Sequence, residues 1–477
     1  MDRIDRIFMK LIEMSLNGVK ESGMSLNGMK NDELPLKGVK KDELSENTEF
    51  SDISPQEWGE IFQLAEKHKT LPLIYESSYQ FLTGTAGQIP GIDRIKLRVR
   101  QKVLQQAVKT DEFLRLNRFL QENGIRPLVV KGIVCRNLYP MPDHRESADE
   151  DLLVFPEQFE RCHELLLEWG MQTSASDAER KASYEVPYRK QGSPLYIELH
   201  KSLFPAESDA YGDWNQFFEG VHERAAAEQI QGNIVYTFSC TDHFFYLICH
   251  AFKHFLHSGF GIRQVCDIIR YASVYGQKID WYKICDNCKK IRAVKFVASI
   301  IKIGVNYLNF RPDEANCPAC FTKLEVDEQP MLEDLLAGGV YGTADLNRQH
   351  SSNMTLDAVA EQKKTAPGAL GVASGKKAVP GTAAEKKAAP GAPGAAAGKK
   401  RNRTAQNVWR TVFPAAKKLE GRYPFLRKYP WLLPAAWVDR LLRYRKETAA
   451  DKTNSAAEAV KIGNQRIELL RMYDVIE

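Results

Sequence analysis

The feature that most constrains the fold is a series of three short apolar segments between residues 126 and 200, each flanked by charged side chains. The first, RPLVV, spans 126–130, the second, DEDLLVF, spans 149–155, and the third, YIELH, spans 196–200. Short apolar runs bounded by turn residues predict buried strands. Helical patterns precede, separate and follow them, which predicts a small mixed sheet flanked by helices, in the α+β class.

Local signals place several of the flanking elements. Ser54 followed by Pro55 predicts an N-cap and the first residue of a helix. A long amphipathic helix is expected over about 93–123, and helices over about 241–309, followed by a helical C-terminal region. Gly192-Ser193 predicts the turn of a hairpin that contains the third strand.

Two segments differ in composition from the rest. Residues 14–43 read as three ten-residue units with Leu, Gly and Lys in register, a period too short for a helix-pair solenoid, and we interpret them as a duplicated surface insertion. Residues 361–403 are rich in Ala, Pro, Gly and Lys and predict a flexible linker, with a basic nucleic-acid or lipid tether as the alternative.

These observations divide the chain into six predicted regions. They are an N-terminal helix with the repeats (1–48), a helical N-terminal region (49–125), a mixed core of strands and helices (126–235), a helical domain (236–345), a disordered linker (346–405) and an aromatic-rich helical C-terminal segment (406–477). No apolar run reaches the ~20 residues of a membrane span, and the start of the chain does not resemble a secretory signal. We therefore expect a cytoplasmic protein with free thiols.

Three carboxylates carry the strongest chemical signal. Asp149 and Asp151 are two residues apart on a predicted strand, so they point to one face, where their charges repel. Glu198 interrupts the third apolar strand and would add a carboxylate on a neighbouring strand. Oxygen ligands of this kind suit Mg²⁺, or Mn²⁺, in a site that aligns a nucleoside triphosphate for in-line attack.

Upstream residues are candidates for phosphate binding. Gly132 would let the backbone approach a phosphate, and the helix that follows would offer N–H groups. Lys131 would hold a triphosphate as a point charge, and Arg145 is a second cation. A lone Asp-x-Asp is more often an ion pair or a solvated turn; the joint order of strand, Lys-Gly, helix, Asp-x-Asp and lone carboxylate favours a site.

That order resembles the nucleotidyltransferase superfamily of DNA polymerase beta, and in detail an uncharacterised bacterial nucleotidyltransferase-like family. The similar motifs are VKG at 130–132, RESADEDLLV at 145–154, ELH at 198–200, HAFKHFLHSGFGIRQVCDI at 250–268, DW at 280–281 and RYPFLRKYPWLLPAAWVDR at 422–440. The resemblance implies a polymerase-beta-like sheet, with Asp149, Asp151 and Glu198 as catalytic metal ligands. Glu198 would help to activate the acceptor hydroxyl.

The resemblance also implies a pocket around the carboxylates, and two departures from the family pattern affect it. The candidate pocket residues are His200, His250, His254, Arg263 and Asp267. His250 and His254 lack the glutamate of an H-E-x-x-H motif, so a buried histidine pair is the alternative. Lys-Gly replaces the superfamily's Gly-Ser, and Glu150 takes a normally apolar position, so its face is incompletely buried or Glu150 pairs with a neighbour.

Cysteines offer a competing interpretation. Two C-x₂-C pairs, Cys285/Cys288 and Cys317/Cys320, resemble a four-thiolate zinc site, but their separation exceeds the usual ~15–20 residues. Zinc is therefore not expected, and buried structural cysteines are the alternative.

The aromatic-rich C-terminal segment suggests packing onto a neighbouring domain or a weak membrane-surface contact. In the membrane interpretation Leu432, Leu433, Leu441 and Leu442 face the lipid, and Arg440, Arg443 and Arg445 face water.

Together these features predict a Mg²⁺-dependent enzyme that transfers a nucleoside monophosphate from a triphosphate to a hydroxyl of a small molecule, sugar or protein. The alternatives are an inactive nucleotide-binding or scaffold protein and a zinc-bearing nucleic-acid binder. The net charge of +5 does not favour the last one, because residues 361–403 hold ten basic and two acidic residues, leaving −3 for the rest of the chain.

Overall fold

The computed structural model describes residues 1–17, 50, 52–82, 86–340, 346–365, 413, 416–419, 423–450 and 456–477. The chain divides into two compact units, Met1–Ala344 and Asp345–Glu477. The predicted mixed α+β architecture is confirmed, with a small sheet in the first unit. Most of the predicted ten-residue repeats lie outside the described residues. Among the described helices, none has the length and apolarity needed to cross a membrane.

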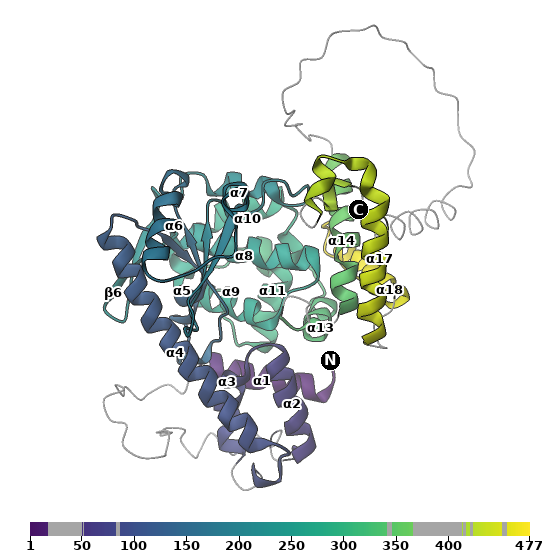
Figure 1. Cartoon of the computed structure of the whole chain (residues 1–477). Coiled ribbons are helices and arrows are strands. Elements are labelled where there is room, and N and C mark those ends of the chain that lie inside the picture. Colours follow the sequence, from purple (N-terminus) through teal and green to yellow (C-terminus); the bar gives the residue numbers. More distant parts are fainter. Residues whose placement is uncertain are drawn as a thin grey trace, which may run out of the picture. The chain divides into compact units, whose positions relative to one another are not determined.

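The first unit begins with a group of helices: α1 (Arg3–Asn17), α2 (Pro55–Lys67) and α3 (Leu71–Ser78). Ser54 caps α2 in a capping box with Glu57, as its sequence predicts. The long helix α4 (Ile92–Glu122) then extends from this group to the sheet (Figure 1). The 3₁₀ turns in this region are Tyr79–Phe81 and Ala86–Gln88.

The sheet has four strands in the order β1-β2-β4-β3. The predicted strands are all present, as β1 (Leu128–Val130), β2 (Glu150–Leu153) and β4 (Tyr196–His200), and β3 (Glu185–Arg189) forms the expected hairpin with β4. β2 runs parallel to β4 and antiparallel to β1, so the sheet is mixed. The central position of β2 and β4 places their polar side chains side by side.

Short helices join the strands. They are α5 (Gly132–Arg136) after β1, a 3₁₀ turn (Pro142–His144) before β2, then a 3₁₀ turn (Pro156–Gln158) with α6 (Phe159–Glu168), and α7 (Asp177–Ala182). The core of this region is apolar, with Val129, Leu152 and Leu199 from the strands meeting Phe113 of α4 and Leu165 of α6. Burial of one face of the strands by these helices fixes the register.

A second hairpin was not predicted. β5 (Ala226–Ile230) and β6 (Asn233–Thr237) pair antiparallel around Gln231 and Gly232, which both have positive φ. A 3₁₀ segment, Gly212–Phe218, precedes them. The Gly-Asn dipeptide at 232–233, between apolar residues, is the hairpin signal that could have revealed this element.

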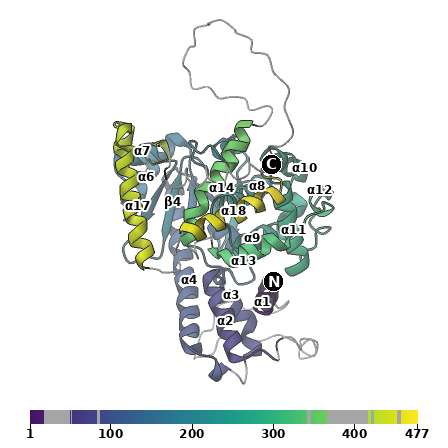
Figure 2. The same ribbon diagram turned by 90° about the vertical axis from the view of Figure 1, so that its right-hand side faces the viewer.

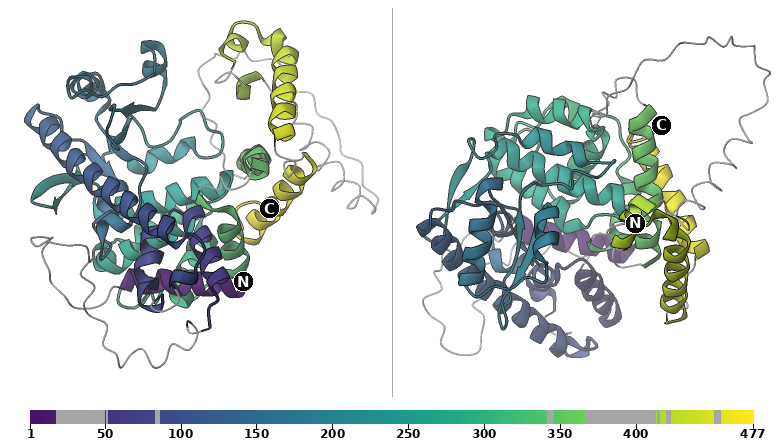
Figure 3. Two further views of the ribbon diagram at one scale, coloured as in Figure 1. Left: turned by 60° about the horizontal axis from the view of Figure 1, so that its bottom comes forward. Right: turned by 45° about the horizontal axis from the view of Figure 1, so that its top comes forward.

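The predicted helices over 241–309 are confirmed. This region contains α8 (Cys240–His257), α9 (Ile262–Tyr275), a 3₁₀ turn (Gly276–Lys278), α10 (Trp281–Lys290) and α11 (Val294–Tyr307), followed by α12 (Ala319–Thr322) and α13 (Gln329–Gly338). These teal to green helices gather into one group in both views of Figure 3. Apolar side chains of α8, α9 and α11 are buried there, including Phe252, Ile269 and Phe296.

The second unit corrects the expectation of a linker over 346–405. Helix α14 (Leu346–Thr365), labelled in Figure 2, occupies the start of that range, and its Met354 side chain is buried against Gly463; residues 366–403 lie outside the described part. The unit also contains α16 (Ala416–Leu419), two 3₁₀ turns (Pro424–Arg427 and Pro430–Leu432), α17 (Leu433–Ala450) and α18 (Ala456–Met472).

The predicted lipid-facing residues do not share one exposed face. Leu432 and Leu433 pack against a cluster formed by Leu419, Tyr423 and Leu426, whereas Leu442 is exposed. Arg443 is exposed and pairs with Asp439 of the same helix. The packing of Leu432 and Leu433 agrees with the core-packing interpretation of this segment, and a membrane contact stays a prediction.

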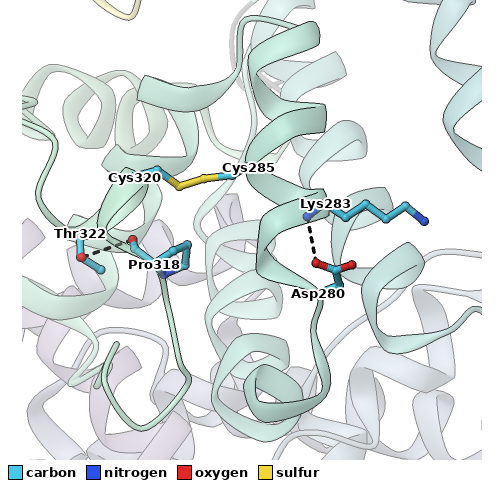
Figure 4. The surroundings of a disulfide bond; sticks show 6 residues. All are labelled: Asp280, Lys283, Cys285, Pro318, Cys320 and Thr322. Carbon is cyan, nitrogen blue, oxygen red and sulfur yellow. Dashed lines mark hydrogen bonds between the residues drawn. A yellow bond between two sulfur atoms is a disulfide. The ribbon is translucent and has the colours of Figure 1, made fainter.

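The cysteines do not form a four-thiolate site. Cys285 of α10 and Cys320 of α12 form a disulfide with a Cα separation of 6.9 Å (Figure 4), which contradicts the expectation that all thiols are free. Cys288 is buried and Cys317 is partly exposed, and both are free thiols. Because two of the four sulfur atoms bond to each other, these cysteines do not form the four-thiolate zinc site that the two C-x₂-C pairs resemble.

A buried histidine in the N-terminal helices predicts loss of stability in acid. His68 is fully buried, and its Nε2 lies 3.2 Å from the carbonyl oxygen of Leu336; this oxygen can only accept, so Nε2 carries the proton. Burial lowers the pKa of His68 to about 4. Below the unfolded-state pKa of about 6.5, the unfolded chain binds a proton that the folded chain excludes, so stability falls as the pH drops toward 4.

We expect the His68→Gln variant to remove this contribution while keeping a donor for the Leu336 carbonyl. The loss of unfolding free energy between pH 7 and pH 5 should be smaller in the variant by about 2 kcal/mol, measured by urea unfolding at both values. An equal loss in wild type and variant would contradict the assignment.

Candidate active site

Three metal-capable side chains converge on one face of the sheet. Asp151 of β2 lies directly beside Glu198 of the parallel strand β4, and His200 follows two residues later on the same face. The Nε2 of His200 is 3.1 Å from Oδ1 of Asp151 and 3.9 Å from Oε2 of Glu198. The strand pairing therefore confirms that Glu198 lies next to the Asp-x-Asp motif.

The electrostatics of this face reflect crowded negative charge. Burial, followed by the charges of Asp151 and Asp149, raises the pKa of Glu198 to about 7. Burial works to raise the pKa of Asp151, but the Lys131 charge and the hydrogen bond from His200 outweigh it and lower that pKa. Burial works to lower the pKa of His200, but the hydrogen bond to Asp151 and the charge of that residue outweigh burial and raise the pKa. An added cation would be favoured here.

Lys131 extends from the loop after β1 toward the carboxylates. Its Nζ is 3.0 Å from Oδ2 of Asp151 and 3.1 Å from Nε2 of His250. Burial, and next the charge of Lys131, lowers the pKa of His250 well below its usual range, so the imidazole is neutral and accepts from the ammonium group. The Nε2 of His254 is 3.3 Å from that of His250, so these two predicted pocket histidines are in contact and His250 joins them to Lys131.

His243 of α8 is a site residue that the sequence analysis missed. The backbone N–H of Lys131 donates to its Nε2 at 3.2 Å, while its Nδ1 is 3.1 Å from Oγ1 of Thr237. Lys131 has a φ of 55°, an uncommon value for a residue with a side chain, so this contact holds a strained loop. The sequence contained a signal for this residue, because His243 falls on the same helical face as His250 and His254.

A recess beside the carboxylates contains most of the remaining candidates. It is lined by Lys131, Gly132, Arg145, Asp149, Leu247, His250, Arg263, Gln264 and Asp267. Asp149 immediately precedes β2 and is half-buried. The other candidates, Asp151, Glu198, His200 and His254, do not line this recess but adjoin it, because Lys131 contacts Asp151 and His250 contacts His254. The predicted zinc cysteines do not line it either.

Arg145 is less available for phosphate than its sequence position suggests. Its guanidinium forms a buried ion pair with Asp267, with Nε 3.1 Å from Oδ1, and Nη2 also contacts this carboxylate. Tyr139 donates to the same carboxylate at 2.8 Å. Arg145 and Asp267 thus form a wall of the recess, and a phosphate would have to compete with Asp267 for the guanidinium.

One of the backbone donors expected for phosphate at the start of α5 already has an acceptor within the protein. The N–H of Ile133 donates to Oε2 of Glu150 at 2.7 Å. The sequence left open whether Glu150 lies on an incompletely buried face or pairs with a neighbour, and pairing is confirmed. Its Oε1 lies 2.6 Å from Nη1 of Arg136 and 3.3 Å from Nζ of Lys109. Gly132 is required here, since a Cβ would lie 1.9 Å from Oε2 of Glu150.

The donor set fits a divalent cation. Asp151, Glu198 and His200 each offer a ligand atom, and these atoms lie within 4.8 Å of one another. Among the residues that the structure describes, this is the one group of three or more metal-capable side chains with that spacing. Its two carboxylates supply the oxygen ligands that Mg²⁺ and Mn²⁺ use, and its neighbour Asp149 adds further negative charge.

Comparison with known proteins agrees with this site. The family model described as "Uncharacterised nucleotidyltransferase" matches residues 54–309, which is more than half of the chain and includes the sheet and the recess. The chain belongs to this nucleotidyltransferase family, which assigns it to the nucleotidyltransferase class of enzymes. Searches of curated proteins and of solved structures found no match.

Proposed function

We propose that this nucleotidyltransferase uses a divalent cation, Mg²⁺ or Mn²⁺, to transfer a nucleoside monophosphate from a triphosphate to a hydroxyl group of a small molecule, sugar or protein. The observation that carries the proposal is the pairing of Asp151 with Glu198 across β2 and β4, with Asp149 beside them. The sheet order and the position of these carboxylates also support a fold like that of DNA polymerase beta.

In this proposal Asp149, Asp151 and Glu198 hold the cation. The cation would neutralise charge on the triphosphate and on the attacking oxygen. Lys131 and Arg263 line the recess in which the phosphates would lie. Lys131 would exchange its ion pair with Asp151 for a contact with a phosphate oxygen.

The proposed reaction forms one bond and breaks one bond. The acceptor oxygen bonds to the α-phosphorus as the bond from that phosphorus to the bridging oxygen breaks and pyrophosphate leaves. Glu198 takes the proton of the acceptor hydroxyl. Without a cation, burial and the charges of Asp151 and Asp149 raise the pKa of Glu198 to about 7; a bound cation would lower it and keep the carboxylate ionised, the form that accepts a proton.

The test is a transfer assay with the full-length protein. Each of the four ribonucleoside triphosphates, labelled at the α-phosphate, is incubated with Mg²⁺ or Mn²⁺ and with a panel of sugars, small alcohols and proteins, including the chain itself. Transfer of label with release of pyrophosphate, abolished by EDTA, supports the proposal. Calorimetric binding of a triphosphate without pyrophosphate release with any acceptor would instead favour the inactive nucleotide-binding alternative.

A further inference from the structure

His200 lies where a metal ligand would be expected. It is the last residue of β4, its side chain is buried, and Nε2 points toward the two carboxylates, 3.1 Å from Asp151 and 3.9 Å from Glu198. The strand alternation fixes this direction, because Glu198 and His200 are two residues apart and share a face. The imidazole therefore faces the same point as the carboxylate oxygens.

The other ring nitrogen has the surroundings of a metal-bound histidine. Nδ1 of His200 is buried and makes no hydrogen bond within the described part of the chain, and Oε2 of Glu185 on β3 lies 3.6 Å away. Metal-ligating histidines usually direct their second ring N–H toward a carboxylate, which fixes the tautomer. With its proton on Nδ1, facing Glu185, His200 would present the Nε2 lone pair to the carboxylates.

We propose that His200 is a direct ligand of the divalent cation through Nε2, beside Asp151 and Glu198, and that the site consequently binds first-row transition ions such as Mn²⁺ and Co²⁺ more tightly than Mg²⁺. This rests on the proposed function only in using the same site. Mg²⁺ prefers oxygen ligands in near-ideal octahedral geometry, whereas an imidazole ligand favours transition ions. Glu185 is then a positioning residue that orients the ring.

A purely structural role for His200 makes a different prediction. If the imidazole only donates a hydrogen bond to Asp151, its removal should weaken Mg²⁺ and Mn²⁺ binding by similar factors. If the nitrogen is a ligand, its removal should weaken Mn²⁺ and Co²⁺ binding selectively. The comparison between ions therefore separates the two roles.

The experiment is calorimetric titration of the full-length protein with Mn²⁺ and with Mg²⁺, without nucleotide, together with visible absorption of the Co²⁺-loaded protein. Wild type should bind Mn²⁺ at least about tenfold more tightly than Mg²⁺. His200→Gln should weaken Mn²⁺ binding about 10- to 100-fold, change Mg²⁺ binding less than about threefold, and reduce the Co²⁺ bands. His163→Gln, at a half-buried histidine of α6 that contacts Tyr188, is the matched control.

Glu185→Gln provides a second test that does not depend on the folding of the His200 variant, since Glu185 is partly exposed at the sheet edge. It should weaken Mn²⁺ binding several-fold and leave Mg²⁺ binding nearly unchanged. Equal affinity of wild type for Mn²⁺ and Mg²⁺, or equal losses for both ions in the His200 variant, would overturn the inference even if nucleotidyl transfer occurs. Selective Mn²⁺ binding without transfer from any triphosphate would instead contradict the proposed function alone.

Discussion

Replacing Asp151 by asparagine should lower nucleotidyl transfer at least about 1,000-fold, which corresponds to roughly 4 kcal/mol of lost transition-state stabilisation. Asp151 lies between three partners, since it neighbours Glu198 across the strands and contacts Lys131 and His200 at 3.0 and 3.1 Å. Its loss removes one ligand of the cation and also the anion that positions Lys131. Asparagine keeps the size of the side chain, so the sheet should remain intact.

Asp149→Asn should have an effect of similar size on transfer but a smaller effect on stability. Asp149 is half-buried at the recess, whereas Asp151 is buried in the strand. The measurement is the initial rate of pyrophosphate release, with thermal unfolding as the check on folding. Asp111→Asn on the exposed face of α4, where Asp111 pairs with Arg115, is the matched control and should leave the rate unchanged. An Asp151 variant with the wild-type rate would refute the proposed mechanism.

The sequence allowed prediction of the strands and of the residues that meet at the site, because both follow from local patterns. Apolar runs of strand length identified β1, β2 and β4, and the two-residue spacing of Asp149 and Asp151 indicated one face. The adjacency of Glu198 needed only that β4 pair with β2, as the register confirms. Local periodicity was sufficient for Asp151, Glu198 and His200 because these side chains lie on the central strands, whereas Asp149 immediately precedes β2.

Long-range partners were not predictable from the sequence. Nothing near Arg145 indicates that its guanidinium binds Asp267, which is 122 positions further along the chain. The disulfide likewise joins one cysteine from each C-x₂-C pair, and spacing alone does not determine connectivity. The shared helical face of His243, His250 and His254 was visible in the sequence, but the role of His243 as acceptor of the Lys131 backbone N–H was not, because that contact depends on how α8 packs against the loop.

Glu150 has an unusual environment for a carboxylate. It is fully buried, and its carboxylate accepts from Arg136, Lys109 and the Ile133 N–H. Burial works to raise the pKa of Glu150, but the charges of Arg136 and Lys109 outweigh it and lower that pKa, so the group is ionised. Glu150 therefore connects β2 to α4 and to the start of α5. Its contact with the Ile133 N–H lies next to the loop that carries Lys131.

We expect Glu150 and Lys109 to contribute very unequally to stability. Glu150→Leu, which restores an apolar residue at this position, should cost about 3–5 kcal/mol because two buried cations lose their anion. Lys109→Met should cost less than about 1 kcal/mol, because Glu150 keeps its pair with Arg136 and one buried charge is removed. Urea unfolding measures both values, and equal losses in the two variants would contradict the argument.

The triple variant Lys109→Met, Arg136→Met and Glu150→Leu separates stability from positioning. Replacing a whole buried charge cluster by apolar residues of similar volume is often neutral, so the triple variant should regain most of the stability lost in Glu150→Leu. It should nevertheless transfer nucleotide about 10- to 100-fold more slowly, because the Ile133 N–H has lost its acceptor and the Lys131 loop is no longer tied to β2. Recovery of stability together with the full rate would show that Glu150 stabilises the fold without positioning the site.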